Sequence, residues 1–189
     1  MRRSRRIAGV FLALSVALLA AGSTAPAASA SGGGCSAGDK PPWRISSGQA
    51  RKAVVCLINE KRAQSGLGPL ERNRQLQRAA QRHSNRMKQS GCFSHQCPGE
   101  GSLDARLRST GYLGGSLGSW SYSENVGWGK KRRATPAKIV EAWMHSPPHR
   151  ANILSGTFKH LGIGIAKGTP QKQNAKGAMY TVDFGRRTG

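Results

Sequence analysis

Residues 160–166 read His-Leu-Gly-Ile-Gly-Ile-Ala, and this short stretch is the most informative about the fold. Large apolar residues at 161, 163 and 165 alternate with Gly162, Gly164 and Ala166. A period of two is typical of a β-strand, and glycine on one face lets another element approach closely. The stretch therefore predicts a strand with one bulky face and one small face, packed under a close neighbour.

The rest of the C-terminal third predicts further strands of the same sheet. Residues 179–184 have the β-branched and aromatic composition of a strand, and the polar segment 167–177 predicts the hairpin loop before it. A third short strand is expected over 125–128.

The region before these strands has helical periodicity. A first helix is expected from about residue 49 to 66, and a second from its cap at Asn73 to Gly91. A short helix is expected over 103–109, and another from Thr135-Pro136 that ends before Pro147-Pro148. Helices first and strands last predict an α+β domain in which helices cover an antiparallel sheet.

The N-terminus has the three parts of a secretory signal peptide. Four arginines precede an apolar stretch over 7–21, and small residues over 25–30 offer cleavage sites. We expect cleavage after Ala30, with Ala27 as the alternative; a twin-arginine signal is a looser match. Residues 31–48 are expected to form a flexible segment before a domain over 49–189. The chain is therefore predicted to be exported and extracellular.

The chain is strongly basic, with 30 Lys+Arg against 8 Asp+Glu and a formal net charge of +22. Its length and the export signal exclude a large multidomain protein and a cytosolic enzyme, and no segment after the leader is apolar enough to span a bilayer. The charge implies attraction to polyanions, among them anionic lipid heads, wall phosphates and nucleic acid. A basic surface that serves only solubility is the alternative.

Four cysteines are expected to form disulfides outside the cell. Of the three pairings, the sequence-local one is preferred: Cys35–Cys56 would attach the N-terminal segment to the first helix, and Cys92–Cys97 would close a tight loop. A zinc site built from Cys92 and Cys97 is the alternative.

Position singles out three polar residues. His95 lies inside the Cys92–Cys97 loop, His149 follows two prolines, and Glu124 lies in a stretch with almost no other acid. A carboxylate near two fixed imidazoles would form a metal-ligand set or an acid–base cluster, and a purely structural polar cluster is the alternative. His83 falls on the apolar face of the second helix and is expected to be a packed core residue.

The order of motifs over residues 54–186 resembles the CAP superfamily of cysteine-rich secretory proteins, antigen 5 and pathogenesis-related 1 proteins, in its secreted bacterial branch. The segments that carry the resemblance are Leu57-Ile58-Asn59-Glu60-Lys61-Arg62, Gly66-Leu67-Gly68-Pro69-Leu70, His83-Ser84-Asn85-Arg86-Met87, Phe93-Ser94-His95, Tyr122-Ser123-Glu124-Asn125-Val126, Trp143-Met144-His145-Ser146-Pro147-Pro148-His149-Arg150-Ala151-Asn152-Ile153-Leu154, Gly162-Ile163-Gly164 and Tyr180-Thr181-Val182-Asp183-Phe184-Gly185. The resemblance implies a three-layer α-β-α sandwich with a central antiparallel sheet and one cleft.

The same resemblance implies a composition for the cleft. Two histidines and two acidic residues typically line it, and many members bind a divalent cation such as zinc there. Matched motif by motif, His95, Glu124 and His149 fill three of these positions, while Ser146 stands where the second acid is expected. The departure leaves less negative charge to hold a cation.

The leading hypothesis is a non-enzymatic extracellular binding module, expected to be monomeric, for a lipid or other apolar ligand, an anionic envelope component or a protein. Aromatic residues near Glu124 would line a groove beside the cleft or pack in the core: Tyr112, Trp120, Tyr122 and Trp128. A metal-assisted, peptidase-like hydrolase with Glu124 as base is the alternative, although no H-E-x-x-H or G-x-S-x-G motif supports it and no catalytic residue is assigned. A polyanion or nucleic-acid binder is a third possibility, without an expected sequence preference.

Overall fold

The computed structural model describes residues 34–188 except 115–117 and 174, all within a unit that spans Gly33–Gly189. The predicted signal peptide lies outside the described residues. The helices are η1 Pro42–Arg44, α1 Ser47–Ala63, α2 Arg74–Ser90, α3 Leu103–Ser109, η2 Lys131–Ala134, α4 Pro136–Met144 and α5 Pro147–Ile153. The strands are β1 Glu71–Arg72, β2 Ser119–Lys130, β3 His160–Lys167 and β4 Gly177–Thr188.

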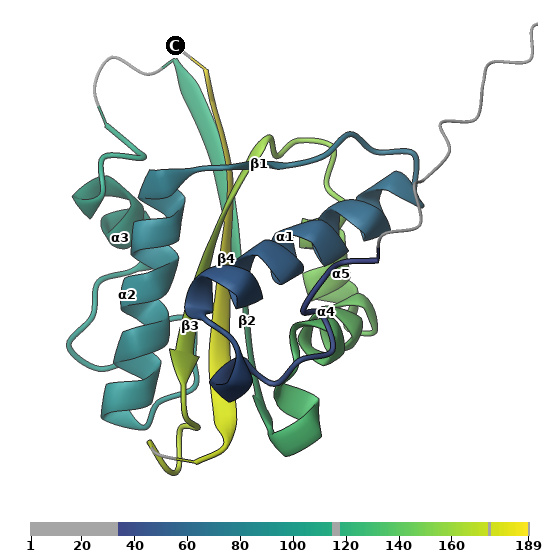
Figure 1. Ribbon diagram of the computed structural model, residues 1–189. Coiled ribbons are helices and arrows are strands. Elements are labelled where there is room, and N and C mark those ends of the chain that lie inside the picture. The colour runs from purple at the N-terminus through teal and green to yellow at the C-terminus, as the bar shows by residue number, and fades with distance from the viewer. Residues whose placement is uncertain (1–33, 115–117, 174, 189) are drawn as a thin grey trace, which may run out of the picture. The chain divides into compact units, whose positions relative to one another are not determined.

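The four strands form one sheet in the order β1-β3-β4-β2. β4 pairs antiparallel with both β3 and β2, whereas the two-residue β1 pairs parallel with β3 at the edge. Helices α2 and α3 lie on one side of the sheet, and α1, α4 and α5 lie on the other (Figure 1). The predicted three-layer α-β-α sandwich is confirmed, with β1 as a parallel addition to the antiparallel sheet.

The glycines of β3 bring α2 onto the sheet at backbone distance. A Cβ atom on Gly162 would overlap the backbone of Leu76 and Gln77, and one on Gly164 would overlap that of Ala80. Side chains larger than hydrogen at 162 and 164 would therefore push α2 away from the sheet. The close neighbour expected from residues 160–166 is helix α2.

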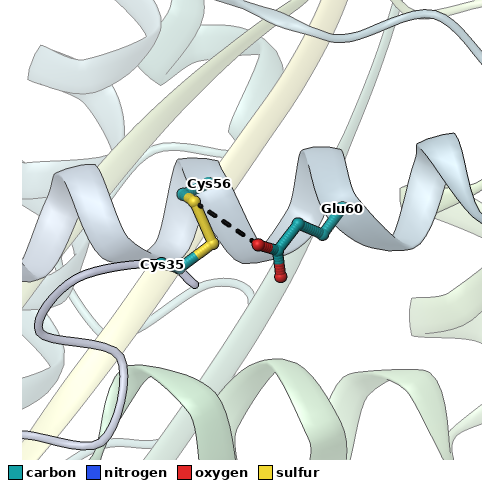
Figure 2. A group of neighbouring side chains, drawn as sticks. All are labelled: Cys35, Cys56 and Glu60. Atoms are coloured by element: carbon teal, nitrogen blue, oxygen red, sulfur yellow. Dashed lines mark hydrogen bonds between the residues drawn. A yellow bond between two sulfur atoms is a disulfide. The ribbon is translucent and has the colours of Figure 1, made fainter. Parts of the chain in front are cut away.

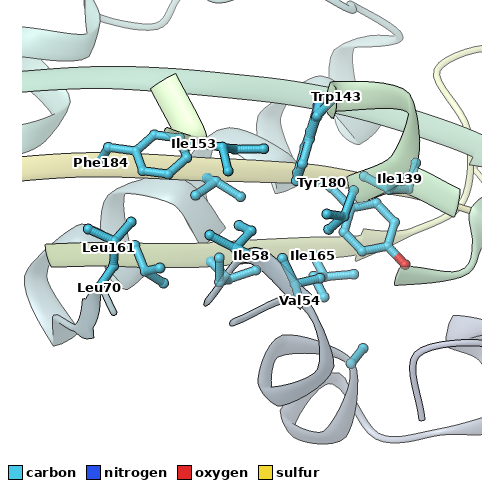
Figure 3. Close-up of a cluster of buried hydrophobic side chains, with 14 of the residues drawn as sticks. Val54, Ile58, Leu70, Ile139, Trp143, Ile153, Leu161, Ile165, Tyr180 and Phe184 are labelled. Carbon is cyan, nitrogen blue, oxygen red and sulfur yellow. The ribbon is translucent and has the colours of Figure 1, made fainter. Parts of the chain in front are cut away.

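The opposite face of the sheet carries the largest of three apolar clusters. Ile163 and Ile165 of β3 and Tyr180 of β4 meet α1, α4 and α5 there (Figure 3). A smaller cluster joins α2 to α3 and the residues after it, and it consists of Leu76, Ala79, Leu107, Tyr112 and Leu113. The third cluster, Met87, Cys97, Val126 and Met179, joins α2 and the loop after it to β2 and β4.

The predicted helix boundaries hold where a capping residue marks them. Asn73 Oδ1 accepts hydrogen bonds from the backbone N–H groups of Gln75 and Leu76, and Gly91 ends α2 with φ of 67°. Helix α1 begins two residues earlier than expected, because Ser46 and Gln49 form a reciprocal capping box.

Three elements differ from the expectations. The strand predicted over 125–128 extends over the whole of β2, because each of its residues pairs with β4. Strand β1 was not predicted, since two polar residues carry no periodicity. Helix α4 does end before Pro147, but Pro147-Pro148 then begin α5, which was missed; proline is well tolerated in the first turn of a helix.

Both preferred disulfides, Cys35–Cys56 and Cys92–Cys97, are present. The first attaches the segment before η1 to the middle of α1 (Figure 2). The second closes the loop after α2, so the sulfurs of Cys92 and Cys97 are not available as zinc thiolates. Within the described residues, none of the helices has both the length and the apolar character needed to cross a membrane.

Candidate functional site: a cleft at the edge strand

Helical layers from both faces of the sheet meet at the edge strand β2. The 92–97 loop follows α2 on one side, and α5 comes from the other side. His95 and Gln96 from the loop, Glu124 from β2 and Asn152 from α5 line one hollow of about 430 Å³. The structure thus brings the predicted residues His95 and Glu124 together.

Glu124 lies behind His95, away from solvent. His95 Nδ1 is 2.8 Å from Glu124 Oε1, and Arg106 Nη2 donates to the other carboxylate oxygen, Oε2. The Glu124 side chain is 1% exposed, whereas that of His95 is 60% exposed. The carboxylate therefore orients the imidazole, and the imidazole is the group that a ligand meets.

The electrostatics of this pair are reciprocal. The hydrogen bond to Glu124 raises the pKa of His95 above its ordinary value, against an opposing effect of burial. Burial alone would raise the pKa of Glu124, but the His95 hydrogen bond and the charge of Arg106 outweigh it and hold that pKa below its usual range. The carboxylate is thus ionised at neutral pH and accepts the Nδ1 proton, which leaves Nε2 as the ring's outward nitrogen.

Arg106 is buried and fixes both the carboxylate and the loop. Its Nη1 donates to the backbone oxygen of His95 over 2.8 Å and lies 3.7 Å from Glu100 Oε2. His83 is in the core, as expected, but it is also part of this network: Nδ1 is 2.8 Å from Glu100 Oε2, and Nε2 is 3.0 Å from the oxygen of Ser94.

Asp183 completes the network from the neighbouring strand. It pairs directly with Glu124 across β2 and β4, so the two side chains share a face of the sheet. Asp183 is fully buried, and neither of its oxygens accepts a hydrogen bond from a described residue. Burial, and then the charge of Glu124, hold the pKa of Asp183 well above its ordinary value, which favours the neutral acid.

His149 is held by neutral partners on α5. Its Nδ1 is 2.8 Å from the hydroxyl of Ser146, which occupies the N-cap position of the helix. The backbone oxygen of His149 accepts from Asn125 Nδ2 over 3.0 Å, and Asn152 Nδ2 donates to Asn125 Oδ1 over 2.8 Å. Burial, together with the nearby charge of His95, lowers the pKa of His149.

An apolar groove of about 260 Å³ begins at His149 and Ser146. Its sides come from β2 and α4, including Trp128 and Trp143, and Phe93 of the disulfide loop lines its mouth with 46% of its surface exposed. Trp143 Nε1 donates to the oxygen of Val126 over 2.9 Å, so the indole is fixed.

Of the four aromatic residues expected near Glu124, only Trp128 lines this groove. Tyr112 is buried in the cluster under α3, and Tyr122 lines the hollow at His95 and donates to Asp104. Trp120 is exposed beside the Arg108 guanidinium, 5.5 Å from the ring centre. Of the four, Tyr112 is therefore a core residue and Trp120 is a surface residue.

The donor atoms fit a divalent cation only in part. Hydrogen bonds among the described residues use Nδ1 of His95 and of His149 and leave both Nε2 atoms free. Both oxygens of Glu124 are already engaged, so Glu124 fits as the group that orients His95 and does not fit as a direct ligand. Among the described residues, the predicted set of His95, Glu124 and His149 does not bring three ligand atoms within 4.8 Å of one another, and His95 and His149 line separate hollows.

Elsewhere among the described residues, three potential ligand atoms lie within 4.8 Å of one another. They belong to Cys35, Cys56 and Glu60 (Figure 2). The two sulfurs form a disulfide, and the Cys56 Sγ to Glu60 Oε1 distance is 3.9 Å. A disulfide sulfur carries no negative charge and is not a metal thiolate, so this group does not fit a metal ion.

Sequence reasoning missed Arg106, Glu100 and Asp183 as members of the site. Asp183 had a detectable signal, because a single acid in the otherwise apolar strand 179–184 has to be neutral or paired when buried. Arg106 had none: it is one of many arginines in this chain, and nothing local marks it as buried.

Comparisons with known proteins concern the family and the fold of this chain. A model of the cysteine-rich secretory protein family, CAP, matches residues 55–184. "Uncharacterized protein YkwD" of Bacillus subtilis is 35% identical over 70% of this chain and 46% of its own length, and "Uncharacterized membrane protein YlbC" of the same organism is 29% identical over 65% and 33%. The chain thus spans less than half the length of these curated relatives.

Solved structures show the same fold. An extracellular protein containing a SCP domain from Bacillus anthracis has a TM-score of 0.54 and 25% identity over 74% of this chain and 43% of its own. An outer surface protein from Borrelia burgdorferi has a TM-score of 0.61 and 19% identity over 76% of this chain and 97% of its own.

Proposed function

The chain belongs to the CAP family of cysteine-rich secretory proteins, and on that premise we propose that it is a non-enzymatic, extracellular binding module for an amphipathic ligand. The polar head of the ligand would lie between His95 and His149, and its apolar part would lie in the groove beside Trp128. The observation that carries the proposal is the continuity of this groove with His149.

The chemistry of the two imidazoles supports an anionic or metal-linked head. Each ring has its Nδ1 fixed by the protein and its Nε2 without a partner among the described residues. The raised pKa of His95 favours the charged ring, which donates to an anion such as a carboxylate. The lowered pKa of His149 favours the neutral ring, which accepts a proton or binds a metal.

The position of Glu124 supports binding over hydrolysis. A general base must reach a water molecule with a free carboxylate oxygen. Here one oxygen accepts from His95 and the other from Arg106, and the side chain is 1% exposed. The same residue that a hydrolase would use as base is therefore committed to orienting His95.

Decanoate and decanol, both below their aggregation limits, test the proposal as probes. We expect tryptophan fluorescence to report saturable binding of decanoate to the wild-type protein. Ala142→Trp would fill the groove and abolish binding, because Ala142 is exposed and lines it. Ala151→Trp is the matched control: Ala151 is equally exposed but lines a separate hollow on α5. Equal binding by the two variants would contradict the proposal.

The head-group part has its own test. His95→Gln should weaken decanoate binding more than decanol binding, because the charged His95 ring donates to the carboxylate. Equal losses for both probes would place the head elsewhere.

The cation is tested separately by calorimetry with zinc chloride at pH 7.5 and 5.5. We expect one-to-one binding at pH 7.5, lost at pH 5.5 and in the His95→Ala/His149→Ala variant, because protonated imidazoles do not bind metals. Glu124→Gln should weaken binding by roughly 10–100-fold without abolishing it, as is usual when a group that orients a ligand is changed. Complete loss in Glu124→Gln, with the fold intact, would make Glu124 a direct ligand.

A further inference from the structure

A row of arginines follows the solvent side of α2, on the face opposite the sheet. Its members are four residues apart: Arg74, Arg78, Arg82 and Arg86. The first three are exposed and the fourth is half-buried. Residues at this spacing form a ridge on a helix, with a rise of about 6 Å per step. The row is therefore a regular line of positive charge.

No carboxylate neutralises this row. The ion pairs among the described residues involve none of the four arginines. Three of them instead donate to neutral oxygens: Arg78 to the backbone of Thr110 over 3.2 Å, Arg82 to the hydroxyl of Ser109 over 3.4 Å, and Arg86 to the backbone of Gly99 over 3.2 Å. These contacts hold the guanidinium groups in place and leave their charge available.

The row ends in a polar hollow of about 470 Å³ between α2, α3 and the glycine-bearing turn before α3. Arg82, Arg86 and Ser109 line it from outside, and the buried Arg106 lines it from within. Arg106 Nε is a buried donor without an acceptor among the described residues. The acid in the lining, Glu100, is already paired, 2.8 Å from His83 Nδ1 and 3.7 Å from Arg106 Nη1.

We propose that this arginine row, residues 74, 78, 82 and 86, with its terminal hollow, binds an extended phosphodiester polymer. The rise of about 6 Å per arginine is close to the separation of successive phosphates in such a chain, and guanidinium groups match phosphate oxygens in a bidentate way. The hollow's lining, all of it within the described residues, contains no aromatic side chain on which bases would stack. The site therefore recognises the backbone and requires no base.

The hollow shares Arg106 and Glu100 with the network behind His95, but the test changes only residues outside that network. The probes are poly(glycerol phosphate), poly(dT) and polyglutamate of equal charge number, measured by fluorescence anisotropy over a range of salt concentrations. For four phosphate contacts, log K should fall with log salt with a slope of roughly −3, since each contact to a single strand contributes about −0.7.

The decisive variant is Arg74→Gln/Arg78→Gln/Arg82→Gln/Arg86→Gln. Its matched control, Lys130→Gln/Lys131→Gln/Arg132→Gln/Arg133→Gln, removes the same four charges from an exposed run at the end of β2 and in η2. We expect the α2 variant to reduce the slope to near zero and the affinity at low salt by at least about 30-fold, while the control keeps most of both. Thermal melting confirms that both variants are folded.

Three outcomes would overturn the proposal. Equal losses of affinity in the two variants would show that net charge alone causes the binding. Binding of polyglutamate as tight as that of poly(glycerol phosphate) would remove the preference for phosphodiesters. Binding of poly(dT) tenfold tighter than poly(glycerol phosphate) would show that bases are read. Comparable binding of the two phosphodiester polymers supports the proposal, and the ratio between them identifies the preferred source.

Discussion

The two histidines of the cleft are held by opposite kinds of structure. His95 rests on buried charges, with Glu124 and Arg106 directly behind it. His149 lies on α5, whose one buried residue is Ile153, and has Ser146 and Asn125 as neutral partners. The His95 half of the site therefore depends on charge balance and pH, whereas the His149 half depends on packing.

The largest effect is expected from Arg106→Met in the His95 half. The substitution leaves the buried carboxylates of Glu124 and Glu100 without their cation, and breaking a buried pair in this way costs about 3–5 kcal/mol. Urea unfolding measures the loss. Arg108→Met on the same helix is the control, because its ion pair with Asp104 is exposed and should contribute little. Similar losses in both variants would contradict the role of buried charge.

A smaller effect is expected from Ile153→Val in the His149 half. Ile153 of α5 is fully buried in the larger core, and removing one methylene there costs about 1 kcal/mol. Because the lost interaction is apolar, the free energy of unfolding should fall by the same amount at pH 5.5 and pH 8.5. A loss that varies with pH would show that the two halves are not separate.

The two imidazoles should respond to pH with opposite sign. The pKa of His95 is raised on folding, so its stabilising effect is fully present below the unfolded value of 6.5 and is lost as pH rises through the higher folded pKa. The pKa of His149 is lowered on folding, so its unfolded ring takes up a proton first, and stability is lost as pH falls from 6.5 through the lower folded pKa.

Single substitutions separate these contributions. In the wild type, His95 should cause the free energy of unfolding to fall as the pH rises above 6.5, and His95→Gln should abolish that fall. His149 should cause it to fall as the pH drops below 6.5, and His149→Gln should abolish that fall. Urea unfolding between pH 5 and 8.5 measures how the free energy of unfolding of each variant depends on pH. The same sign for both histidines would mean that their surroundings are alike.

The smallest effect at neutral pH is expected from Asp183→Asn. The raised pKa of Asp183 favours its neutral form, and an amide of the same shape is also neutral. Because its folded pKa is raised, the wild type loses stability as pH rises above the unfolded value of 3.8, and the variant should lack that loss. Unfolding at pH 4.5 and 8 measures the difference. A strongly destabilised variant at pH 8 would indicate that Asp183 is ionised.

The sequence predicted the parts of the molecule that local patterns determine. The alternation at 160–166, the Asn73 cap and the Cys92–Cys97 spacing each correspond to an observed strand, helix or disulfide. Resemblance placed His95 and Glu124 in one cleft, and the structure places them in contact.

What local patterns did not predict was long-range pairing. Strand β2 is long because β4 lies beside it, and Arg106 is buried because Glu124 faces it from another element. An arginine on a short helix has the same local sequence whether it is exposed or paired in the interior. Only the assembled fold shows that Glu124 is already bound by the protein itself.

The central claim is that Glu124 fixes His95 with Nδ1 protonated and Nε2 directed to the ligand. Long-range ¹H–¹⁵N NMR of the histidine rings at pH 8.5, where the neutral form is favoured, tests it most directly. We expect the Nδ1–H tautomer for His95, which is the reverse of the tautomer that dominates in a free histidine side chain. An Nε2–H tautomer would contradict it, because the Glu124 carboxylate would then have no proton to accept from the ring.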